Sequence, residues 1–322
     1  MPRWFHELTG LPAHDRAAVR AQVVPEGHGL RCLANGRLLW PGQLHMPALR
    51  DLRRDPIPAR GPLRLSEVVA DVQALHLDPA HAGAVFQVAS QFNLLEMVSP
   101  EVTPDDGIDR YIHDKTQGPA CAVACGAGTL WRNDFVPLSG GTGQTETRQI
   151  DCLADLGAAL GNGEGRLWEM RNGYALPRPG GLAAVAHRLA ALDVAGRDAL
   201  RGMVRVGIQA DTEVTLRHAG HRVTQIYCSA LPVLYGDDPA QDWEPFARLV
   251  LEAAYEATFR AALRHAAPDA PLFLTLLGGG AFGNRRAWIV DAIARSVDMF
   301  ENSGLDVRLV SFRVPSGALE GL

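Results

Sequence analysis

A glycine cluster near the C-terminus is the part of this chain whose residue types and spacing point most directly to chemistry. The apolar run 272–277 leads into Gly278, Gly279, Gly280, Ala281, Phe282, Gly283 and Asn284, and a helix is expected from about Arg285. Glycines let the backbone turn tightly and approach an anion closely, and the amides that open a helix are free N–H donors at the positive end of a dipole. The cluster therefore predicts a phosphate or pyrophosphate site. The alternative is a tight turn with packing glycines.

Other phosphate-binding motifs fit less well. Gly278, Gly280 and Gly283 match the G-x-G-x-x-G spacing of a dinucleotide-binding unit. That unit needs an acidic residue at the end of the next strand, and here the strand ends at Ser311, Phe312 and Arg313. A nicotinamide-dependent oxidoreductase is therefore disfavoured. The chain also lacks the Lys-Ser or Lys-Thr of a P-loop, the G-x-S-x-G of a hydrolase elbow and the H-E-x-x-H of a zinc peptidase.

Strands that alternate with helices must position the glycine cluster. The last hundred residues predict a strand at 222–229, a helix at 243–265, a strand at 272–277, a helix at 287–297 and a strand at 306–312. Such alternation indicates right-handed crossovers and a mainly parallel sheet. Upstream, the buried strand 84–89 ends on polar residues that include Asn93, at the position where open α/β sheets bind ligands. Asn93 is a candidate ligand contact, or a turn-former that bonds its own backbone.

The remaining segments predict additions to this unit. Residues 1–62 are interpreted as an N-terminal extension, with short helices at 15–24 and 47–54 and a hairpin at Asn35-Gly36. Residues 65–72 carry apolar side chains at helical spacing, and a long helix is expected from about 107 to 130. The glycine-rich region at about 139–220 predicts an insertion, in which residues 168–174 shape the pocket or form the lobe's own core. The expected fold is α/β, a three-layer arrangement whose mixed, mostly parallel sheet is flanked by helices over residues 63–322.

Composition bounds the partners. The chain has 322 residues, 47% of them hydrophobic, and a net charge of −5, so it can bury a large core and shows no basic excess for nucleic acid. Its five cysteines (Cys32, Cys121, Cys125, Cys152 and Cys228) form no disulfide or zinc pattern. No apolar run approaches the length of a membrane span, and the N-terminus does not resemble a signal peptide. We therefore expect a cytoplasmic protein that binds no membrane, metal or cofactor.

The order and residues of these segments resemble the macrodomain superfamily, whose members bind ADP-ribose. Residues 85–93 look like the strand that ends on the asparagine contacting the distal ribose, here Asn93. Residues 104–108 resemble the first, catalytic loop, and residues 225–235 the strand and loop before the long helix. Residues 274–283 resemble the second phosphate-binding loop, and Phe312 stands where the family often places an aromatic ring on adenine. The resemblance spans roughly 85–312 with the insertion excepted.

The chain departs from common macrodomains at the first loop. Asp105 and Asp106 replace the usual glycines, and some eighty residues are inserted after this loop. Residues 106–111 and 114–119 look more like a divergent branch that includes the MavL-type ADP-ribosylhydrolases. The resemblance thus implies an ADP-ribosylhydrolase that acts on ADP-ribosylated protein, with arginine the favoured linkage. The alternative is a reader module that binds ADP-ribose without cleaving it.

Four aspartates of the first loop carry the expected chemistry. Cleavage at the anomeric carbon passes through an oxocarbenium-like state, which a carboxylate stabilises or supplies with an activated water. Asp105, Asp106, Asp109 and Asp114 fall within ten residues of one another, and Asp106 and Asp114 are the first choices. Any one of them can instead be a helix cap or turn residue. Gln117 is a candidate for holding the substrate or a water.

Overall fold

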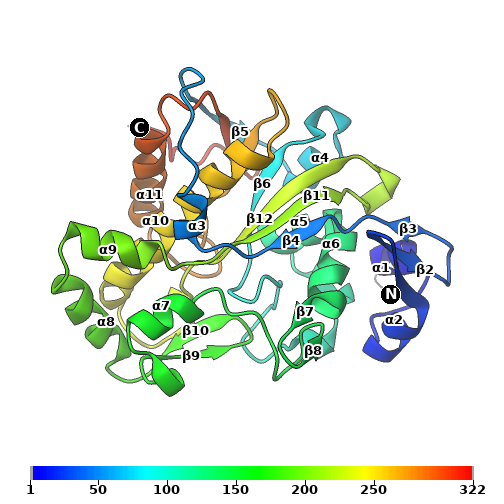
Figure 1. Ribbon diagram of the computed structural model, residues 1–322, viewed down its shortest axis with the longest axis horizontal. Helices are drawn as coiled ribbons and strands as arrows, with labels where there is room; N and C mark the ends of the chain where they lie inside the picture. The colour runs from blue at the N-terminus through cyan, green and yellow to red at the C-terminus, as the bar shows by residue number, and fades with distance from the viewer. Residues whose placement is uncertain (1–2, 321–322) are drawn as a thin grey trace.

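A seven-stranded sheet lies at the centre of the computed structural model, which describes residues 3–320 (Figure 1). The strand order is β4-β11-β12-β6-β13-β14-β5. β12, β6, β13, β14 and β5 run parallel, β11 is antiparallel to β12, and β4 is antiparallel to β11. The carboxyl ends of the five parallel strands therefore meet along one edge. The strands span Gln43–His45 (β4), Arg64–Val69 (β5), Val85–Ala89 (β6), Gly207–Glu213 (β11), Arg222–Cys228 (β12), Leu272–Leu274 (β13) and Asp306–Ser311 (β14).

Helices cover both faces of this sheet, as two neighbouring residues of β6 show. The Phe86 ring stacks on His76 of α4 with the ring centroids 3.7 Å apart. The side chain of Gln87 points the other way and donates to Thr258 Oγ1 of α10 over 3.1 Å. The predicted α/β class, with a mixed, mostly parallel sheet between helices, is confirmed. The helices on the first face are α4 (Val72–Leu77), α5 (Gln117–Ala124) and α6 (Gly126–Leu130), and those on the second are α10 (Ala240–His265) and α11 (Arg286–Met299).

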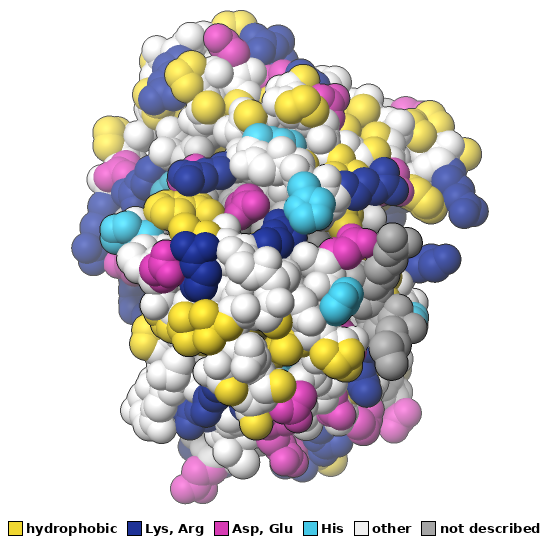
Figure 2. Space-filling view, turned by 90° about the vertical axis from the view of Figure 1, so that its right-hand side faces the viewer, with side chains coloured by type: hydrophobic (Ala, Val, Ile, Leu, Met, Phe, Trp, Pro, Cys, Tyr) yellow, Lys and Arg dark blue, Asp and Glu magenta, His cyan; other side chains and the backbone are white. Residues whose placement is uncertain are grey.

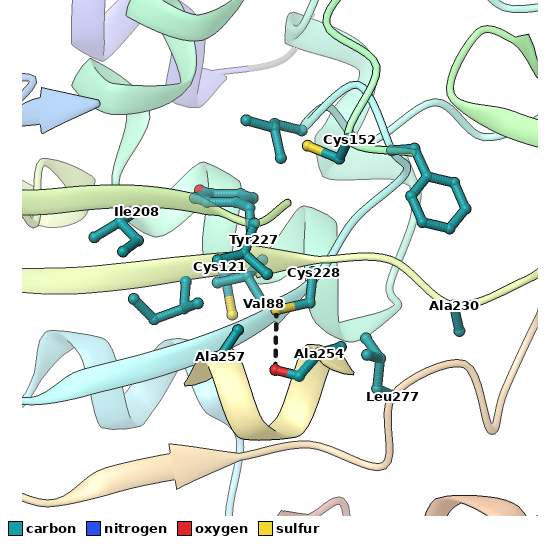
Figure 3. Close-up of a cluster of buried hydrophobic side chains, with 14 of the residues drawn as sticks. Val88, Cys121, Cys152, Ile208, Tyr227, Cys228, Ala230, Ala254, Ala257 and Leu277 are labelled. Carbon is teal, nitrogen blue, oxygen red and sulfur yellow. Dashed lines mark hydrogen bonds between the residues drawn. The ribbon is translucent and has the colours of Figure 1, made fainter. Parts of the chain in front are cut away.

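The core between sheet and helices contains several of the cysteines. Figure 3 shows Cys121, Cys152 and Cys228 among apolar side chains, with Cys228 bonded to the Ala254 carbonyl of α10 over 3.9 Å. All five cysteines are free and buried. Burial raises the pKa of Cys228 to about 12, so its thiol stays protonated. Within the described residues, no group of three or more His, Cys, Asp or Glu side chains is placed to hold a metal ion.

The segment 65–72 is a strand where a helix was predicted, and that prediction is wrong. Arg64–Val69 forms β5, which pairs in parallel with β14 from Asp306 to Ser311. Helix α4 begins only at Val72, after Asp71, whose carboxylate accepts a hydrogen bond from the Gln73 amide. The apolar spacing in this segment fits either structure, and the partner strand that decides between them lies more than two hundred residues away.

The N-terminal extension and the insertion both contribute strands to the central sheet. β4, from the first 62 residues, pairs with β11, and β11 starts at Gly207 within the expected insertion. Residues 207–213, which were expected to belong to the insertion, therefore form a strand of the central sheet. The hairpin predicted at Asn35-Gly36 is confirmed, since it joins β2 to β3. The other elements are α1 (Arg3–Thr9), α2 (Arg16–Gln22), β1 (Val23–Glu26), β2 (Gly29–Cys32), β3 (Leu38–Leu39), α3 (Leu49–Leu52), β7 (Pro137–Leu138), β8 (Gly141–Thr142), α7 (Ala154–Ala159), β9 (Trp168–Arg171), β10 (Tyr174–Pro177), α8 (Gly181–Ala190) and α9 (Val194–Arg201).

The surface carries no large field of one sign on the face that Figure 2 shows. Basic and acidic side chains are interspersed there with small apolar groups. Among residues 3–320 no helix is both long and apolar enough to cross a membrane.

A buried carboxylate fastens the helices on the second face. The Glu256 side chain of α10 is fully buried and receives hydrogen bonds from Arg53 at 2.7 Å, Arg260 at 2.9 Å and Arg295 at 3.1 Å. Burial alone would raise the pKa of Glu256, but the hydrogen bonds and charge of Arg53, helped by the other two arginines, lower it to about 2. Glu256 thus joins α10 to α11 and to the segment that follows α3.

Replacing Glu256 by Gln should destabilise the fold by about 3 kcal/mol at pH 7, because three guanidinium groups lose the charge of Glu256, although Arg53 and Arg295 keep Asp198. The folded state holds this carboxylate ionised more strongly than the unfolded chain does. The contribution is therefore complete above pH 4.5 and declines as the pH falls toward 2. Denaturant unfolding should show that the difference in unfolding free energy between parent and variant becomes smaller as the pH is lowered from 4.5 toward 2.

Glu244→Gln is the matched control. It breaks a part-exposed ion pair with Arg248 on the same helix and should cost less than about 1 kcal/mol. Equal losses for the two variants would contradict the role given to Glu256.

Candidate active site

Three adjoining cavities lie at the carboxyl edge of the sheet. The central cavity, about 210 Å³, lies between the end of β6 and the glycine loop 275–284. The β14-side cavity, about 700 Å³, lies between α4, α5 and the end of β14. The loop cavity, about 490 Å³, is lined by Glu96, Val98, Val102, Arg110, Tyr111, His113, Asp114 and Lys115. Asp114 lines all three, so the cavities adjoin one another, and together they are called the cleft below.

The glycine loop presents free backbone amides to this cleft. Its own hydrogen bonds run from Gly279 to Leu276, from Gly283 to Gly280 and from Asn284 to Gly278. The amides of Gly280, Ala281 and Phe282 donate to no acceptor among residues 3–320. These three residues and Gly278 line the central cavity. The predicted anion-binding loop is therefore open to a ligand, and its donors come from the loop rather than from the first turn of α11.

The glycines of this loop serve two different purposes. Gly278 has a φ of +73°, and a Cβ added there would lie 2.4 Å from the Ala230 Cβ. A Cβ on Gly283 would lie 2.2 Å from the Leu234 Cγ. Those two positions need glycine for packing, whereas a Cβ on Gly280 meets no atom within 4 Å.

The remaining loop positions hold the turn together. The Asn284 side chain donates to the Leu231 carbonyl over 2.8 Å and to the Gly278 carbonyl over 3.3 Å. Gly279, Gly283 and Asn284 do not line the central cavity, in contrast to Gly278, Gly280, Ala281 and Phe282. The turn interpretation thus describes Gly279, Gly283 and Asn284, and anion binding stays a prediction for Gly280, Ala281 and Phe282.

The first loop differs from its prediction. The prediction of a helix from near Gly107 is wrong. Residues 104–106 and 109–113 form short 3-10 turns, and α5 starts only at Gln117. Asp105 accepts hydrogen bonds from Arg16 and from the Glu146 amide, each over 2.8 Å. The Asp106 carboxylate accepts hydrogen bonds from the Thr103 amide and hydroxyl. The hydrogen bond from the amide in particular lowers the pKa of Asp106.

Asp105, Asp106 and Asp109 line none of the three cavities, whereas Asp114 does. The cap and turn interpretation therefore describes Asp106, whereas Asp105 bonds two residues that are remote in sequence. Asp114 is half-buried, and its Oδ1 accepts from the Thr116 amide over 2.8 Å. Of the four predicted aspartates, Asp114 is the one in position to meet a ligand in the cleft.

Gln117 fixes the start of α5 to the end of β6. Its Oε1 accepts from the Ala89 amide over 2.9 Å, and its Nε2 donates to the Gln87 carbonyl over 2.8 Å. The side chain lines both the central and the β14-side cavity, but its polar atoms are bonded to β6. Its observed role is to place Asp114 and the first turn of α5 beside the glycine loop.

Glu96 is a cleft residue that the sequence interpretation missed. Only 4% of it is exposed, it lines the central and loop cavities, and no partner for its Oε1 lies among the described residues. Burial raises the pKa of Glu96 well above its ordinary value; the charge of Arg132 opposes this shift and that of Asp114 adds to it. Burial therefore favours the protonated form of Glu96, which lies next to Asp114 in the cleft.

One signal in the sequence could have revealed Glu96. It is a lone acidic residue in the apolar run 94–97, directly after the polar end of strand β6. An acid in such a run is buried against its solvation preference, which is common at functional sites.

Arg132 supports the segment that carries Glu96. Its guanidinium is completely buried, donates to the Leu94 carbonyl over 3.0 Å and to Gln209 over 3.2 Å, and lies 3.6 Å from the centre of the Tyr227 ring. It forms no ion pair within residues 3–320. The stacking and neutral acceptors replace the hydration of this cation.

The β14-side cavity offers a ring and a carboxylate. Phe312 follows β14, is 63% exposed and lines this cavity, as expected for an aromatic platform. Asp71 lines the same cavity from the start of α4 and was not singled out in the sequence. Its Oδ1 already accepts from the Gln73 amide, and its second oxygen can accept from a ligand.

Asn93 does not line the cleft. It is fully buried, its Oδ1 accepts from the Leu95 amide over 3.1 Å, and its Nδ2 donates to Gln149 over 2.9 Å. A side chain that bonds the backbone two residues on is a turn-former, which was the alternative interpretation of Asn93.

The inserted region contributes one wall of the central cavity. Tyr174 of β10 lines it together with Tyr235 and Phe282, with ring centroids 5.0 and 5.3 Å from that of Tyr174. The Tyr174 hydroxyl donates to the Met97 carbonyl over 2.6 Å. Trp168 instead packs in the core against Phe246. Both interpretations of residues 168–174 therefore hold, each for a different residue.

Comparison with known proteins gives fold-level likeness at low identity. No protein-family profile and no curated protein matches the chain. It is similar to a mutant poly(ADP-ribose) glycohydrolase from Deinococcus radiodurans solved with ADP-ribose, at 13% identity and a TM-score of 0.41, covering 86% of this chain and 92% of that one. It is also similar to the Thermomonospora curvata poly(ADP-ribose) glycohydrolase bound to the inhibitor ADP-HPD, at 12% identity and a TM-score of 0.44, covering 94% and 92%. At these scores neither neighbour assigns a function to this chain.

Glu96→Gln should make the protein more stable at pH 8 and leave it unchanged near pH 4. Above pH 4.5 the unfolded chain releases the Glu96 proton, whereas burial favours its retention in the folded protein. The parent therefore loses stability as the pH rises from 4.5 toward 8. Glutamine carries no such penalty. Thermal unfolding should show a gain of about 2–6 °C at pH 8.

The exposed Glu101, on the same loop, supplies the control variant Glu101→Gln, which should show no such gain. A difference between Glu96→Gln and parent that does not vary with pH would contradict the assignment of a neutral acid.

Proposed function

We propose that this protein binds ADP-ribose and hydrolyses the bond between its distal ribose and a protein side chain. The observation that carries the proposal is the pair of carboxyl groups, Glu96 and Asp114, at the junction of the central and loop cavities. Burial raises the pKa of Glu96, and the negative charge of Asp114 adds to that shift. Carboxyl groups whose environments separate their protonation are the usual acid and base of glycoside hydrolysis.

The cleft offers each part of ADP-ribose a fitting surface. The free amides of Gly280, Ala281 and Phe282 suit the pyrophosphate. The β14-side cavity suits the adenosine, because Phe312 can stack on the base and Asp71 can accept from its amino group. The distal ribose then occupies the central cavity, next to Glu96 and Asp114.

Hydrolysis at this position divides the work between the two carboxyl groups. Glu96, held protonated by burial, donates its proton to the leaving side chain as the glycosidic bond breaks. The Asp114 carboxylate stabilises the positive charge that develops on the ribose, orients the water that attacks the anomeric carbon and accepts the proton that this water releases. Asp105, Asp106 and Asp109 have no part in this scheme.

Arginine remains the linkage to test first. The carboxylate of Asp114 can pair with a leaving guanidinium, and the resemblance of residues 114–119 to the MavL-type branch supports the same choice. The proposal agrees with the ADP-ribose held in the Deinococcus neighbour but does not rest on it. A reader module would need the glycine loop but not a buried acid with an unsatisfied oxygen, so the pair favours catalysis.

Gly280→Leu should abolish ADP-ribose binding while leaving thermal stability close to that of the parent. The leucine side chain would enter open space in front of the free amides, and residue 280 lacks the positive φ that only glycine tolerates. Calorimetric titration with ADP-ribose measures the effect, and Gly163→Leu, at an exposed glycine outside the cleft, is the control. Undiminished affinity in Gly280→Leu would remove the pyrophosphate from this loop.

Glu96→Gln and Asp114→Asn should each lower turnover by about a hundredfold or more while affinity for ADP-ribose changes little. Both side chains act on charge that forms in the transition state, which the free ligand lacks. Release of ADP-ribose from arginine-, serine- and glutamate-linked peptides measures the effect.

Asp109→Asn is the control for turnover, since Asp109 belongs to the same loop but lies outside the cavities. If the parent binds ADP-ribose tightly and cleaves none of the three linkages, the reader function replaces the hydrolase. Full turnover in both Glu96→Gln and Asp114→Asn would end the two-carboxyl mechanism.

A further inference from the structure

We infer that the loop cavity binds an acidic peptide segment, the part of the substrate protein that carries the modified side chain. Its place in the reaction rests on the proposed function, while its preference for acidic peptide rests on its own residues. Nothing in the proposed function specifies the sequence around the modified residue.

The loop cavity lies where the leaving group of the proposed reaction would be. It meets the central cavity at Glu96, Val98 and Asp114, which include the two carboxyl groups of the proposed mechanism. No residue of the glycine loop lines it. A ligand whose pyrophosphate lies on the glycine loop and whose ribose reaches Glu96 would therefore extend its leaving group into the loop cavity.

The volume of the loop cavity exceeds what one side chain needs. At about 490 Å³ it is more than twice the central cavity and falls in the range of pockets for drug-sized ligands. Val98 and Val102 give it an apolar wall, and Val98 is 55% exposed. A few residues of an extended peptide would fit against this wall.

The charges around the loop cavity favour an anionic occupant. Arg110, His113 and Lys115 line it, and neither His113 nor Lys115 has a hydrogen-bond or ion-pair partner among residues 3–320. Arg110 lies 3.8 Å from the Asp106 carboxylate with half of its side chain exposed, so it can turn toward a ligand. The acidic lining residues are Asp114 and Glu96, and only 4% of Glu96 is exposed. Carboxylates that flank the modified residue would find unpaired cations here.

A peptide fits these residues better than a second nucleotide unit. The loop cavity has no glycine among its lining residues and thus no backbone cradle for phosphate. Its one aromatic residue, Tyr111, is 4% exposed and bonds the Glu96 amide through its hydroxyl, so its ring offers no platform for a base. Separate cations on flexible side chains match separate carboxylates along a chain.

The test compares two fluorescein-labelled, unmodified heptapeptides, one with glutamate and one with glutamine at alternate positions, by fluorescence polarisation at low salt. The acidic peptide should bind at least about tenfold more tightly and weaken as salt is raised. Arg110→Gln should cost about threefold and Arg110→Glu about tenfold in its affinity. Arg188→Glu, the same charge change at an exposed residue of α8 outside the cleft, should cost nothing. Arg110 is the diagnostic residue because Lys115 also lines the β14-side cavity.

A parallel assay uses ADP-ribosylarginine peptides with the same two flanks, whose kcat/KM values should differ about tenfold in favour of the acidic one. Equal affinity for the two unmodified peptides, or equal losses in Arg110→Glu and Arg188→Glu, would overturn the inference. Acidic-peptide binding that depends on Arg110, in a protein that neither binds ADP-ribose nor cleaves any linkage, would support the inference and refute the proposed function. If a dimer of ADP-ribose displaces the peptide far better than ADP-ribose does, and Arg110→Gln removes that advantage, the cavity belongs to a phosphate-bearing chain instead.

Discussion

The cleft depends on the close contact between the first turn of α5 and the end of β6. A Cβ on Gly118 would lie 1.9 Å from the Ala89 carbonyl oxygen and 2.3 Å from the Glu96 Oε2, so only glycine lets the helix approach this far. Gln117 secures the contact with one hydrogen bond to the Ala89 amide and one to the Gln87 carbonyl. Gln117 and Gly118 thus set the position of Asp114, which precedes α5 in the chain, and of Glu96, which packs against its first turn. If the helix lay farther from β6, water could reach the Glu96 carboxyl and its protonation would return toward the ordinary range.

The same contact explains how one short region can hold two carboxyl groups in different environments. Asp114 stands before the helix, half-buried and bonded to the Thr116 amide. Glu96 lies under the helix, where its Oε1 has no partner within the described chain. Arg132 supplies positive charge from below but donates its hydrogen bonds to Leu94, Gln209 and Thr129 instead of to Glu96. Arg132 therefore offsets only part of the effect of burial, and the pKa of Glu96 stays well above its ordinary value.

Sequence patterns predicted the parts of this protein that are set by local chemistry. The strands and helices from Arg222 onward, the glycine loop and the hairpin at Asn35-Gly36 all have short-range signals, and their positions match within a few residues. The strand β5 was mistaken for a helix because its apolar spacing fits both, and its partner β14 is remote in sequence. The first loop was predicted to carry the catalytic carboxylates, but three of its four aspartates lie outside the cavities. Which carboxyl group faces the cleft depends on tertiary packing, and Glu96 acquires its character only from what covers it.

The N-terminal extension has a consequence for how this protein could be shortened. β4 covers the outer edge of β11, where Gln43, Leu44 and His45 pair with Ala210, Gln209 and Ile208. Without β4, a domain cut to residues 63–322 would present an open row of backbone donors and acceptors, which invites pairing with another chain and aggregation. The side chain of Gln209, which accepts from Arg132, also donates to the Pro41 carbonyl over 2.7 Å. Truncation would therefore remove the acceptor of Gln209, and Gln209 in turn bonds Arg132, which supports the segment that carries Glu96.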